Sequence, residues 1–287
     1  MIGAVLVDKA AGMTSHDVVR AVRRIFRIRA VGHTGTLDPF ATGLLVLLLG
    51  RATRLARFLA GQPKRYLATA RLGIRTTSDD LTGAPLNEIP DELPGETRIL
   101  EELVAFRGRQ LQRPPLYSAK HVAGERSYRR ARRGETIDLE PVEVTVHRIE
   151  PVEYRAPHLT FRAEVSAGTY LRAIARDLGD RLGVGAHLTS LRREAVGPLT
   201  VDQAVPLERL DPDAVLPAHT VLTDLPQIEL DGESRQAVAH GRAVLDAREA
   251  GKRGGGEAVA LLDSGELVAI ATAGDGWLRP TVVLSDR

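Results

Sequence analysis

The sequence predicts an α+β protein of two domains, residues 1–220 and residues 221–287. Helical and strand-like apolar patterns are interleaved in the first domain, whereas short strands separated by glycine turns fill the second. The net charge also changes sign between them. Three prolines mark the boundary, Pro206, Pro212 and Pro217.

The elements of the first domain begin with a strand at residues 2–8 and a turn at Gly12. Thr14 or Ser15 can cap a helix that follows. That helix places apolar side chains on one face, namely Val18, Val19, Val22, Ile25 and Phe26. The apolar run 44–49 predicts a buried strand, and the alternation over residues 65–72 predicts another.

The middle of the chain changes from acidic to basic. Residues 79–106 hold 8 acids and one Arg, and they predict a surface connection that ends in a helix over 98–106. Residues 107–133 hold 9 basic residues and one acid, and they predict an excursion of loop and helix from the surface. Strands are expected at 141–149 and 158–166, followed by a helix over 169–182 that Gly183 ends.

The second domain is expected to be a small β structure. Its strands are predicted at residues 227–230, 258–263, 267–272 and 281–284. A mobile loop is predicted inside it, from Arg248 to Gly256.

Composition excludes several classes of site. The chain has no cysteine, which excludes disulfides, a thiol nucleophile, Cys-ligated zinc and iron–sulfur clusters. The eight histidines show no ligand spacing, so no metal is expected, and the phosphate-binding and dinucleotide-binding glycine motifs are absent. The longest apolar run is too short for a membrane span and no signal peptide is recognisable, so a soluble cytoplasmic protein is expected.

Charge favours a polyanion as partner. Residues 1–78 carry 13 Lys and Arg against 3 Asp and Glu, and residues 200–287 carry 8 against 15. A basic first domain suits nucleic acid. Solvated arginine-rich helices would give the same count.

The loop 32–43 is the first candidate for chemistry. Asp38 precedes Pro39 and lies close to His33, just before a strongly buried strand. A loop at the edge of a rigid strand is a good place for a catalytic carboxylate. Asp38 could instead cap a helical turn that has Pro39 at its first position.

Two further segments carry candidates. Tyr170 and Arg172 stand at the start of the predicted helix, where an aromatic ring and a guanidinium suit a flipped base and its phosphate. Arg176 is expected to pair with Asp180 on the surface. Tyr66 could stack on a base, although the residues alone favour a core aromatic.

Together these segments resemble the TruB family, the tRNA pseudouridine-55 synthases. Five motifs occur in the family's order over roughly residues 1–200. They are the run from Gly32 to Leu45 around Asp38, Lys64-Arg-Tyr66, the run from Gln112 to Ala119, Gly168-Thr-Tyr-Leu-Arg172 with its continuation to Gly179, and Leu191-Arg-Arg193. The C-terminal β segment is more weakly similar to a PUA-type RNA-binding domain.

The resemblance implies a pseudouridine synthase fold with a mixed, mostly antiparallel sheet and a thumb inserted at about 107–135. It implies isomerisation of uridine 55 in the tRNA T loop after base flipping, without a cofactor. Asp38 matches the catalytic aspartate, Tyr66 the tyrosine that stacks on the base, and Arg172 the arginine that pairs with the aspartate. The other residues expected to bind substrate or RNA are His33, Tyr170, Leu191, Lys64, Arg65, Lys120 and Arg126.

The expected partner is the T stem-loop of tRNA, with no membrane and no obligatory protein partner, so a monomer is expected. Two alternatives stay open, a guide-RNA-dependent synthase and an RNA-binding chaperone of tRNA folding. The long thumb argues against guide dependence. Two departures from the family's usual lysines, His121 and Ala167, bear on RNA contacts more than on the reaction.

The chemistry needs an ionised carboxylate in an enclosed site. Burial would raise the pKa of Asp38 from about 3.9, and a nearby guanidinium opposes that shift. Arg172 is therefore interpreted as the group that keeps Asp38 charged. Attack on C1′, attack on C6 and removal of the C2′ proton all remain open.

Overall fold

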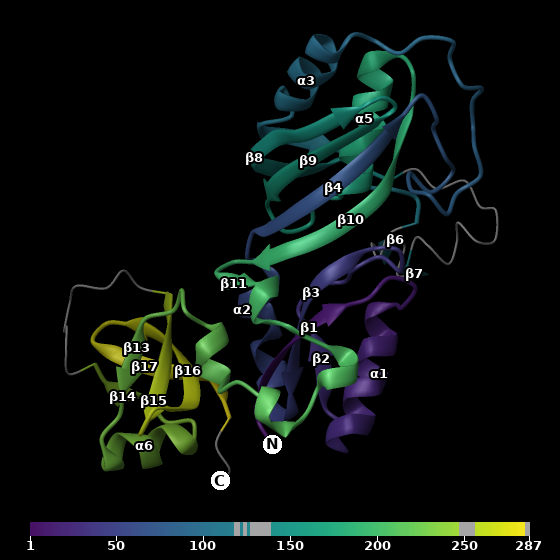
Figure 1. Ribbon diagram of the computed structural model, residues 1–287. Helices are drawn as coiled ribbons and strands as arrows, with labels where there is room; N and C mark the ends of the chain where they lie inside the picture. The colour runs from purple at the N-terminus through teal and green to yellow at the C-terminus, as the bar shows by residue number, and fades with distance from the viewer. Residues whose placement is uncertain (118–120, 123–124, 127–138, 247–255, 285–287) are drawn as a thin grey trace.

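A computed structural model describes residues 1–117, 121–122, 125–126, 139–246 and 256–284, and it contains two main sheets (Figure 1). The larger sheet has ten strands, β1 (Gly3–Lys9), β2 (Val31–His33), β3 (Thr42–Leu49), β4 (Lys64–Leu72), β5 (Gly108–Gln112), β8 (Val142–Arg155), β9 (His158–Val165), β10 (Ala186–Val196), β11 (Leu199–Thr200) and β12 (Val205–Pro206). Their order is β12-β1-β3-β10-β4-β9-β8-β5, with β2 on β3 and β11 on β10.

The pairing confirms the predicted fold class. Only β1 with β12 and β3 with β10 pair in parallel, and every other pair in this sheet is antiparallel. A curled sheet of β13 (Gln227–Glu229), β14 (Val244–Leu245), β15 (Glu257–Asp263), β16 (Glu266–Gly274) and β17 (Trp277–Val283) follows near the C-terminus (Figure 1). Two short strands pair with each other, β6 (His121–Val122) and β7 (Glu125–Arg126).

Three helices cover one face of the large sheet, α1 (Ser15–Phe26), α3 (Glu96–Val104) and α5 (Leu171–Leu182). Thr14 caps α1 through a reciprocal capping box with Asp17, and Gly183 ends α5 in the left-handed conformation. The apolar sides of these helices share one core with the sheet. Ile25 is the exception in the predicted stripe of α1, because its side chain is 38% exposed.

Strand β3 is buried on both faces, which explains its unbroken apolar sequence. Leu45, Leu47 and Leu49 belong to the core under the helices. The residues between them, Leu44, Val46 and Leu48, belong to a second core shared with the C-terminal sheet, η1 (Gly50–Leu55) and α2 (Ala56–Ala60).

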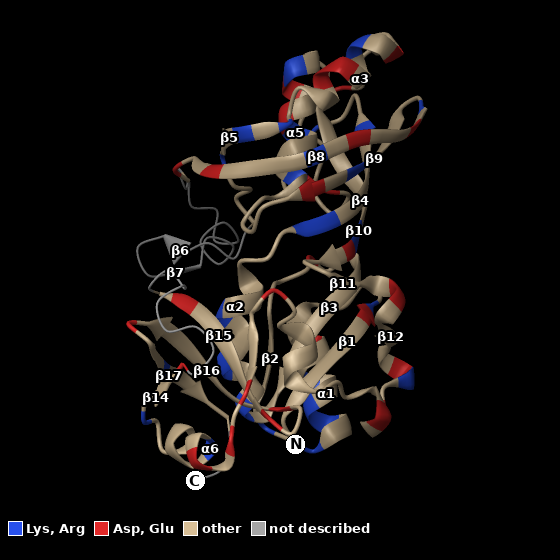
Figure 2. Ribbon diagram, turned by 90° about the vertical axis from the view of Figure 1, so that its left-hand side faces the viewer, with Lys and Arg blue, Asp and Glu red and all other residues tan. Residues whose placement is uncertain are grey.

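Basic residues lie on parts of α1 and near α2, where Figure 2 draws Lys and Arg in blue.

Strands β3 and β10 join the two halves of the large sheet through only two residue pairs, Arg192 with Thr42 and Arg193 with Gly43. Gly43 has a φ of +98°, and a Cβ atom there would lie 2.3 Å from the Arg193 carbonyl oxygen. Only glycine allows this approach of the two backbones. The loop that carries Asp38 enters the sheet at this junction.

The structure corrects several expectations. Residues 108–112 form β5 at the sheet edge rather than a surface excursion, and 186–196 form the central strand β10, which the sequence patterns did not reveal. β14 and α6 (Gly232–Ala239) were also missed, and β17 begins earlier than predicted. Residues 118–120, 123–124 and 127–135 of the expected thumb lie outside the described residues, as does the predicted mobile loop apart from Gly256.

Candidate active site

A cavity of about 320 Å³ lies between the loop 34–38, β4, β10 and the start of α5. The chain segments that line it are far apart in the sequence, from the Asp38 loop to β10. Of the residues predicted from the sequence, the cavity wall contains Asp38, Lys64, Tyr66, Tyr170, Arg172 and Leu191. The fold therefore brings the catalytic candidates to one place.

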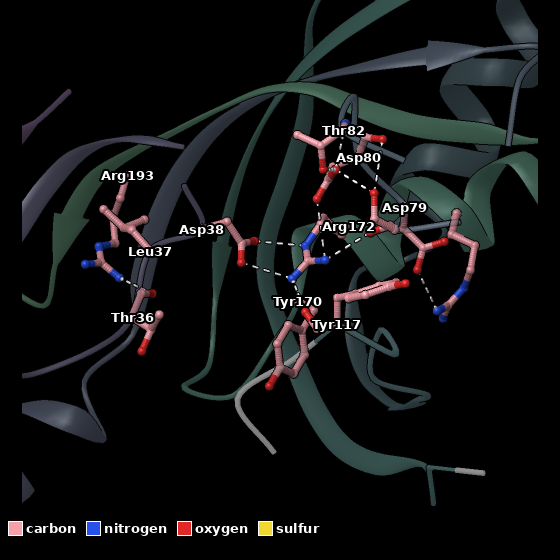
Figure 3. Close-up of polar contacts among 12 residues, drawn as sticks. Thr36, Leu37, Asp38, Asp79, Asp80, Thr82, Tyr117, Tyr170, Arg172 and Arg193 are labelled. Atoms are coloured by element: carbon pink, nitrogen blue, oxygen red, sulfur yellow. Dashed lines mark hydrogen bonds and ion pairs between the residues drawn. The ribbon is translucent and has the colours of Figure 1, made fainter. Parts of the chain in front are cut away.

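Asp38 and Arg172 contact each other directly in the wall of this cavity (Figure 3). The Arg172 Nη2 atom donates to Asp38 Oδ1 at 3.0 Å. Arg172 Nε lies 2.9 Å from Oδ2, an ion-pair distance without an aligned hydrogen bond. The guanidinium side chain is only 3% exposed, whereas the carboxylate keeps 29% of its surface open. The pair thus presents the carboxylate, and not the guanidinium, to a bound molecule.

Burial dominates the electrostatics of Asp38 and raises the pKa of its carboxyl group above the ordinary value of 3.8. Arg172 opposes this shift by its charge and its hydrogen bond, and the charge of Lys9 opposes it to a smaller extent. Asp80 adds to the rise by like-charge repulsion. Arg172 therefore acts in the predicted direction, but it does not cancel the effect of burial.

The loop 34–41 is fixed by hydrogen bonds rather than by regular structure. The Ser15 hydroxyl, at the start of α1, accepts from Leu37 N at 2.8 Å and donates to Leu37 O at 3.2 Å. Lys9 Nζ donates to the Pro39 carbonyl of this loop at 3.4 Å, and also to the carbonyls of Ala10 and Met13. Asp38 caps no helix here, because residues 39–41 form only a turn.

Arg193 is a second support for this loop, although sequence analysis assigned it no role beyond its motif. Its side chain is 2% exposed and donates to three backbone carbonyls, Leu44 O at 2.7 Å, Gly35 O at 3.1 Å and Thr36 O at 3.3 Å. A buried guanidinium needs such acceptors when no carboxylate pairs with it. The Leu191-Arg-Arg193 motif was the only signal in the sequence.

Two consecutive aspartates in the segment after β4 hold the arginines of α5. Asp80 Oδ2 lies 3.5 Å from Arg172 Nη1, and its Oδ1 accepts from Ser78 and Thr82. Asp79 pairs with Arg176 at 3.2 Å. The predicted surface pair of Arg176 with Asp180 is therefore wrong, because Arg176 is 8% exposed and turned inward. Proximity along a helix did not reveal these partners.

Tyr66 and Leu191 form the apolar side of the cavity. Lys64 and Tyr66 lie two residues apart on the inward face of β4, and Tyr66 is 8% exposed. Lys64 Nζ donates to the carbonyls of Ala60 and Gln62, and burial lowers the pKa of Lys64 to about 8. Tyr66 is thus both a buried aromatic and part of the cavity wall, so the two readings of its sequence context are compatible.

The remaining predicted residues lie elsewhere. Arg65 points to the opposite face of β4, where its Nε lies 3.5 Å from Glu194. His33 lies in β2, half-buried and outside the cavity wall. The backbone of Arg126 belongs to β7, and Lys120 lies outside the described residues.

Within the ranges that the structure describes, no group of three or more His, Cys, Asp or Glu side chains is arranged to hold a metal ion. Over the same ranges, no helix has the length and apolar character needed to cross a bilayer.

Two family models match consecutive parts of the chain. Residues 23–171 match TruB family pseudouridylate synthase (N terminal domain), and residues 172–226 match tRNA pseudouridylate synthase B C-terminal domain. The chain is 43% identical to tRNA pseudouridine synthase B of Thermobifida fusca, over 99% of this chain and 98% of that protein. It is 41% identical to the protein of the same name from Solibacter usitatus, over 99% and 100%.

Solved structures show the same architecture. A chain in an H/ACA RNP bound to a substrate RNA containing 2′-deoxyuridine superposes with a TM-score of 0.75 and 25% identity, over 99% of this chain and 86% of that chain. A chain in a Cbf5-Nop10-Gar1 complex superposes with a TM-score of 0.72 and 29% identity, over 94% and 78%.

Proposed function

Because this chain belongs to the TruB family of pseudouridylate synthases, we propose that it isomerises uridine 55 in the T loop of tRNA to pseudouridine. A single chain performs this reaction in the cytoplasm, without a cofactor or partner protein. The observation that carries the proposal is the Asp38–Arg172 pair, which presents a carboxylate to a cavity that also has an aromatic wall.

The reaction exchanges one glycosidic bond for another. The bond between ribose C1′ and uracil N1 breaks, a bond between C1′ and C5 forms, C5 loses a proton and N1 gains one. Asp38 supplies the carboxylate, either as a nucleophile toward carbon or as a base toward a proton. Each role needs the ionised form, which the Arg172 guanidinium favours.

The cavity suits an extruded nucleotide. Its volume is at the lower end of the range for small-molecule sites. A uridine in a folded loop has to leave its stack to reach an enclosed carboxylate. Tyr66 would contact the base by its face, and that contact tolerates rotation of the detached uracil better than directional hydrogen bonds do. Tyr170 and Leu191 would close the sides.

Exposed arginines beside the cavity would bind the RNA backbone. Ala60, at the end of α2, lines the cavity, and Arg57, Arg54 and Arg51 continue away from it along α2 and η1. The turn after α1 lies next to Arg51, because Gly50 N donates to the Ala30 carbonyl. Binding through phosphates should weaken steeply as salt concentration rises.

Asp38→Asn tests the proposal. The variant should bind an unmodified tRNA transcript and leave uridine 55 unconverted, as measured by mapping pseudouridine after incubation. Asp8→Asn is a matched control, because Asp8 also pairs with an arginine, Arg192, and has the same 29% exposure, but lies outside the cavity wall. The control should convert the transcript normally.

The same assay separates the alternatives. Normal conversion by Asp38→Asn would contradict the role of this carboxylate. Conversion of bare tRNA by the unaltered protein would exclude a requirement for guide RNA. If the unaltered protein converts no uridine but accelerates tRNA folding, and Asp38→Asn does the same, the chain is an RNA chaperone.

A further inference from the structure

The segment 112–117 forms a strap across the first turns of α5. The Gln112 side-chain amide makes two hydrogen bonds with the backbone of Tyr170. Its Nε2 donates to Tyr170 O at 3.1 Å, and its Oε1 accepts from Tyr170 N at 2.9 Å. Gln112 is 3% exposed. Gln112 therefore attaches the strap to Tyr170, the residue that precedes α5.

Both buried arginines of α5 hold carbonyl groups of this strap. Arg176 Nη2 donates to Arg113 O at 2.9 Å, and Arg172 Nη2 donates to Tyr117 O at 2.8 Å. Pro114 and Pro115 stand between these two carbonyls and are buried. Because proline fixes its own φ, the strap is stiff between its two points of attachment.

The contact at Tyr117 involves the same nitrogen that binds the candidate carboxylate. Arg172 Nη2 is shared between Tyr117 O and Asp38 Oδ1 (Figure 3). A shift of the strap would therefore move an acceptor that helps to hold the guanidinium against Asp38. Arg176 is itself held, by Asp79 at 3.2 Å and by Asp177 at 2.8 Å.

We propose that Gln112 and Arg176 are positioning residues of the reaction, which hold the strap so that its Tyr117 carbonyl keeps Arg172 in place against Asp38. The inference rests on the proposed function of Asp38. Neither residue lines the cavity, so neither touches the reacting nucleotide and both act through Tyr170 and Arg172.

The charges around Asp38 make this role measurable. Arg172 from α5 and Lys9 from β1 favour the ionised carboxylate, whereas Asp80 from the segment after β4 opposes it. If Arg172 moves away, burial and Asp80 act with less opposition. The pH at which the reaction loses its carboxylate should then rise.

The test compares Arg176→Gln and Gln112→Met with the unaltered protein, in single-turnover conversion of a tRNA transcript across a range of pH. Each variant should react roughly tenfold more slowly or worse at neutral pH, as a small misplacement of catalytic groups would cause. The acid limb of the rate profile should move to higher pH. Affinity for the transcript, measured by filter binding, should not change.

Arg181→Gln is the matched control on the same helix, because Arg181 lies over the Phe106 ring and makes no contact with the strap in the described residues. It should leave the rate and its pH profile unchanged. Arg176→Gln leaves Asp79 and Asp177 without their partner and could fail to fold. Gln112→Met then carries the test, since it leaves no charge unpaired.

Three outcomes would overturn the inference. They are an unchanged rate in the folded variants, a slower rate with an unmoved acid limb, and an equal loss in Arg181→Gln. Failure of the unaltered protein to convert the transcript would contradict the proposed function instead, so the two failures are distinguishable.

Discussion

At the scale of single residues, Asp38 is subject to opposing influences. Burial raises the pKa of its carboxyl group, and the Arg172 guanidinium lowers it. Because burial is the larger effect, the carboxylate is kept ionised less firmly than a surface aspartate would be. A desolvated anion is also a more reactive base or nucleophile than a hydrated one. The burial that raises the pKa of Asp38 therefore also favours the proposed chemistry.

The pH dependence of the rate should reflect this balance. We expect the single-turnover rate with saturating enzyme to decrease as the pH is lowered through the pKa of Asp38, which burial raises above the ordinary value of 3.8. The profile can be measured from about pH 8 down to the pH at which circular dichroism shows that the protein begins to unfold. An acid limb at or below the ordinary aspartate value would contradict the effect of burial.

The same shift predicts the stability of Asp38→Asn. The folded state holds the Asp38 proton to higher pH than the unfolded state, so stability is lost as pH rises through that interval. Asparagine cannot ionise, so the melting temperature of the Asp38→Asn variant at pH 7 should equal or exceed that of the unaltered protein. Asp8→Asn, which only removes a partner of Arg192, should not raise it. A clear drop for Asp38→Asn would refute this expectation.

At the scale of elements, the site depends on the narrow junction of β3 and β10. Two residue pairs join the halves of the sheet, and the loop with Asp38 enters at one of them. Arg193 donates from β10 to the carbonyls of that loop, which ties the loop to the neighbouring strand. The position of the carboxylate is thus set by strand pairing as well as by the loop itself.

Gly43→Ala should disrupt this junction. The added Cβ atom would lie 2.3 Å from Arg193 O, and the backbone there has a φ of +98°. We expect a loss of about 2–4 kcal/mol in the free energy of unfolding, measured by urea denaturation. Gly232→Ala is the control, because nothing lies within 4 Å of its Cβ position. Equal stability of the two variants would show that the junction tolerates a side chain.

At the scale of the whole molecule, the C-terminal sheet is not a separate body. Ile270 in β16 and Leu48 in β3 are both fully buried and belong to one core cluster. Arg51 and Arg54 donate to the carbonyls of Leu284 and Val283 at the end of β17. The boundary near residue 220 remains a prediction, but the two parts on either side of it share apolar packing.

Shared packing predicts shared unfolding. Trp277 is the only tryptophan and reports on the C-terminal sheet, whereas far-ultraviolet circular dichroism reports on the whole chain. The two transitions should coincide on denaturation. Ile270→Ala should move both together and reduce the free energy of unfolding by about 2–5 kcal/mol. An early transition of the fluorescence alone would show that the C-terminal sheet unfolds independently.

Local patterns in the sequence were sufficient to predict several helices and strands and to identify the catalytic candidates. Apolar periodicity predicted α1, β4 and α5, because alternation and helical spacing are properties of neighbouring residues. The motif order placed Asp38, Tyr66 and Arg172 together before any contact was known, and the structure brings them to one cavity.

Contacts between groups far apart in the chain could be seen only in the folded protein. Arg176 points to Asp79 and the strap rather than to Asp180, and Arg193 binds carbonyls about 150 residues away in the chain. Strand β10 showed no clear period in the sequence because its register shifts twice against β4, and Arg65 faces away from the cavity because β4 alternates its faces. Partners of buried charges depend on how strands and helices pack, and no local pattern specifies that packing.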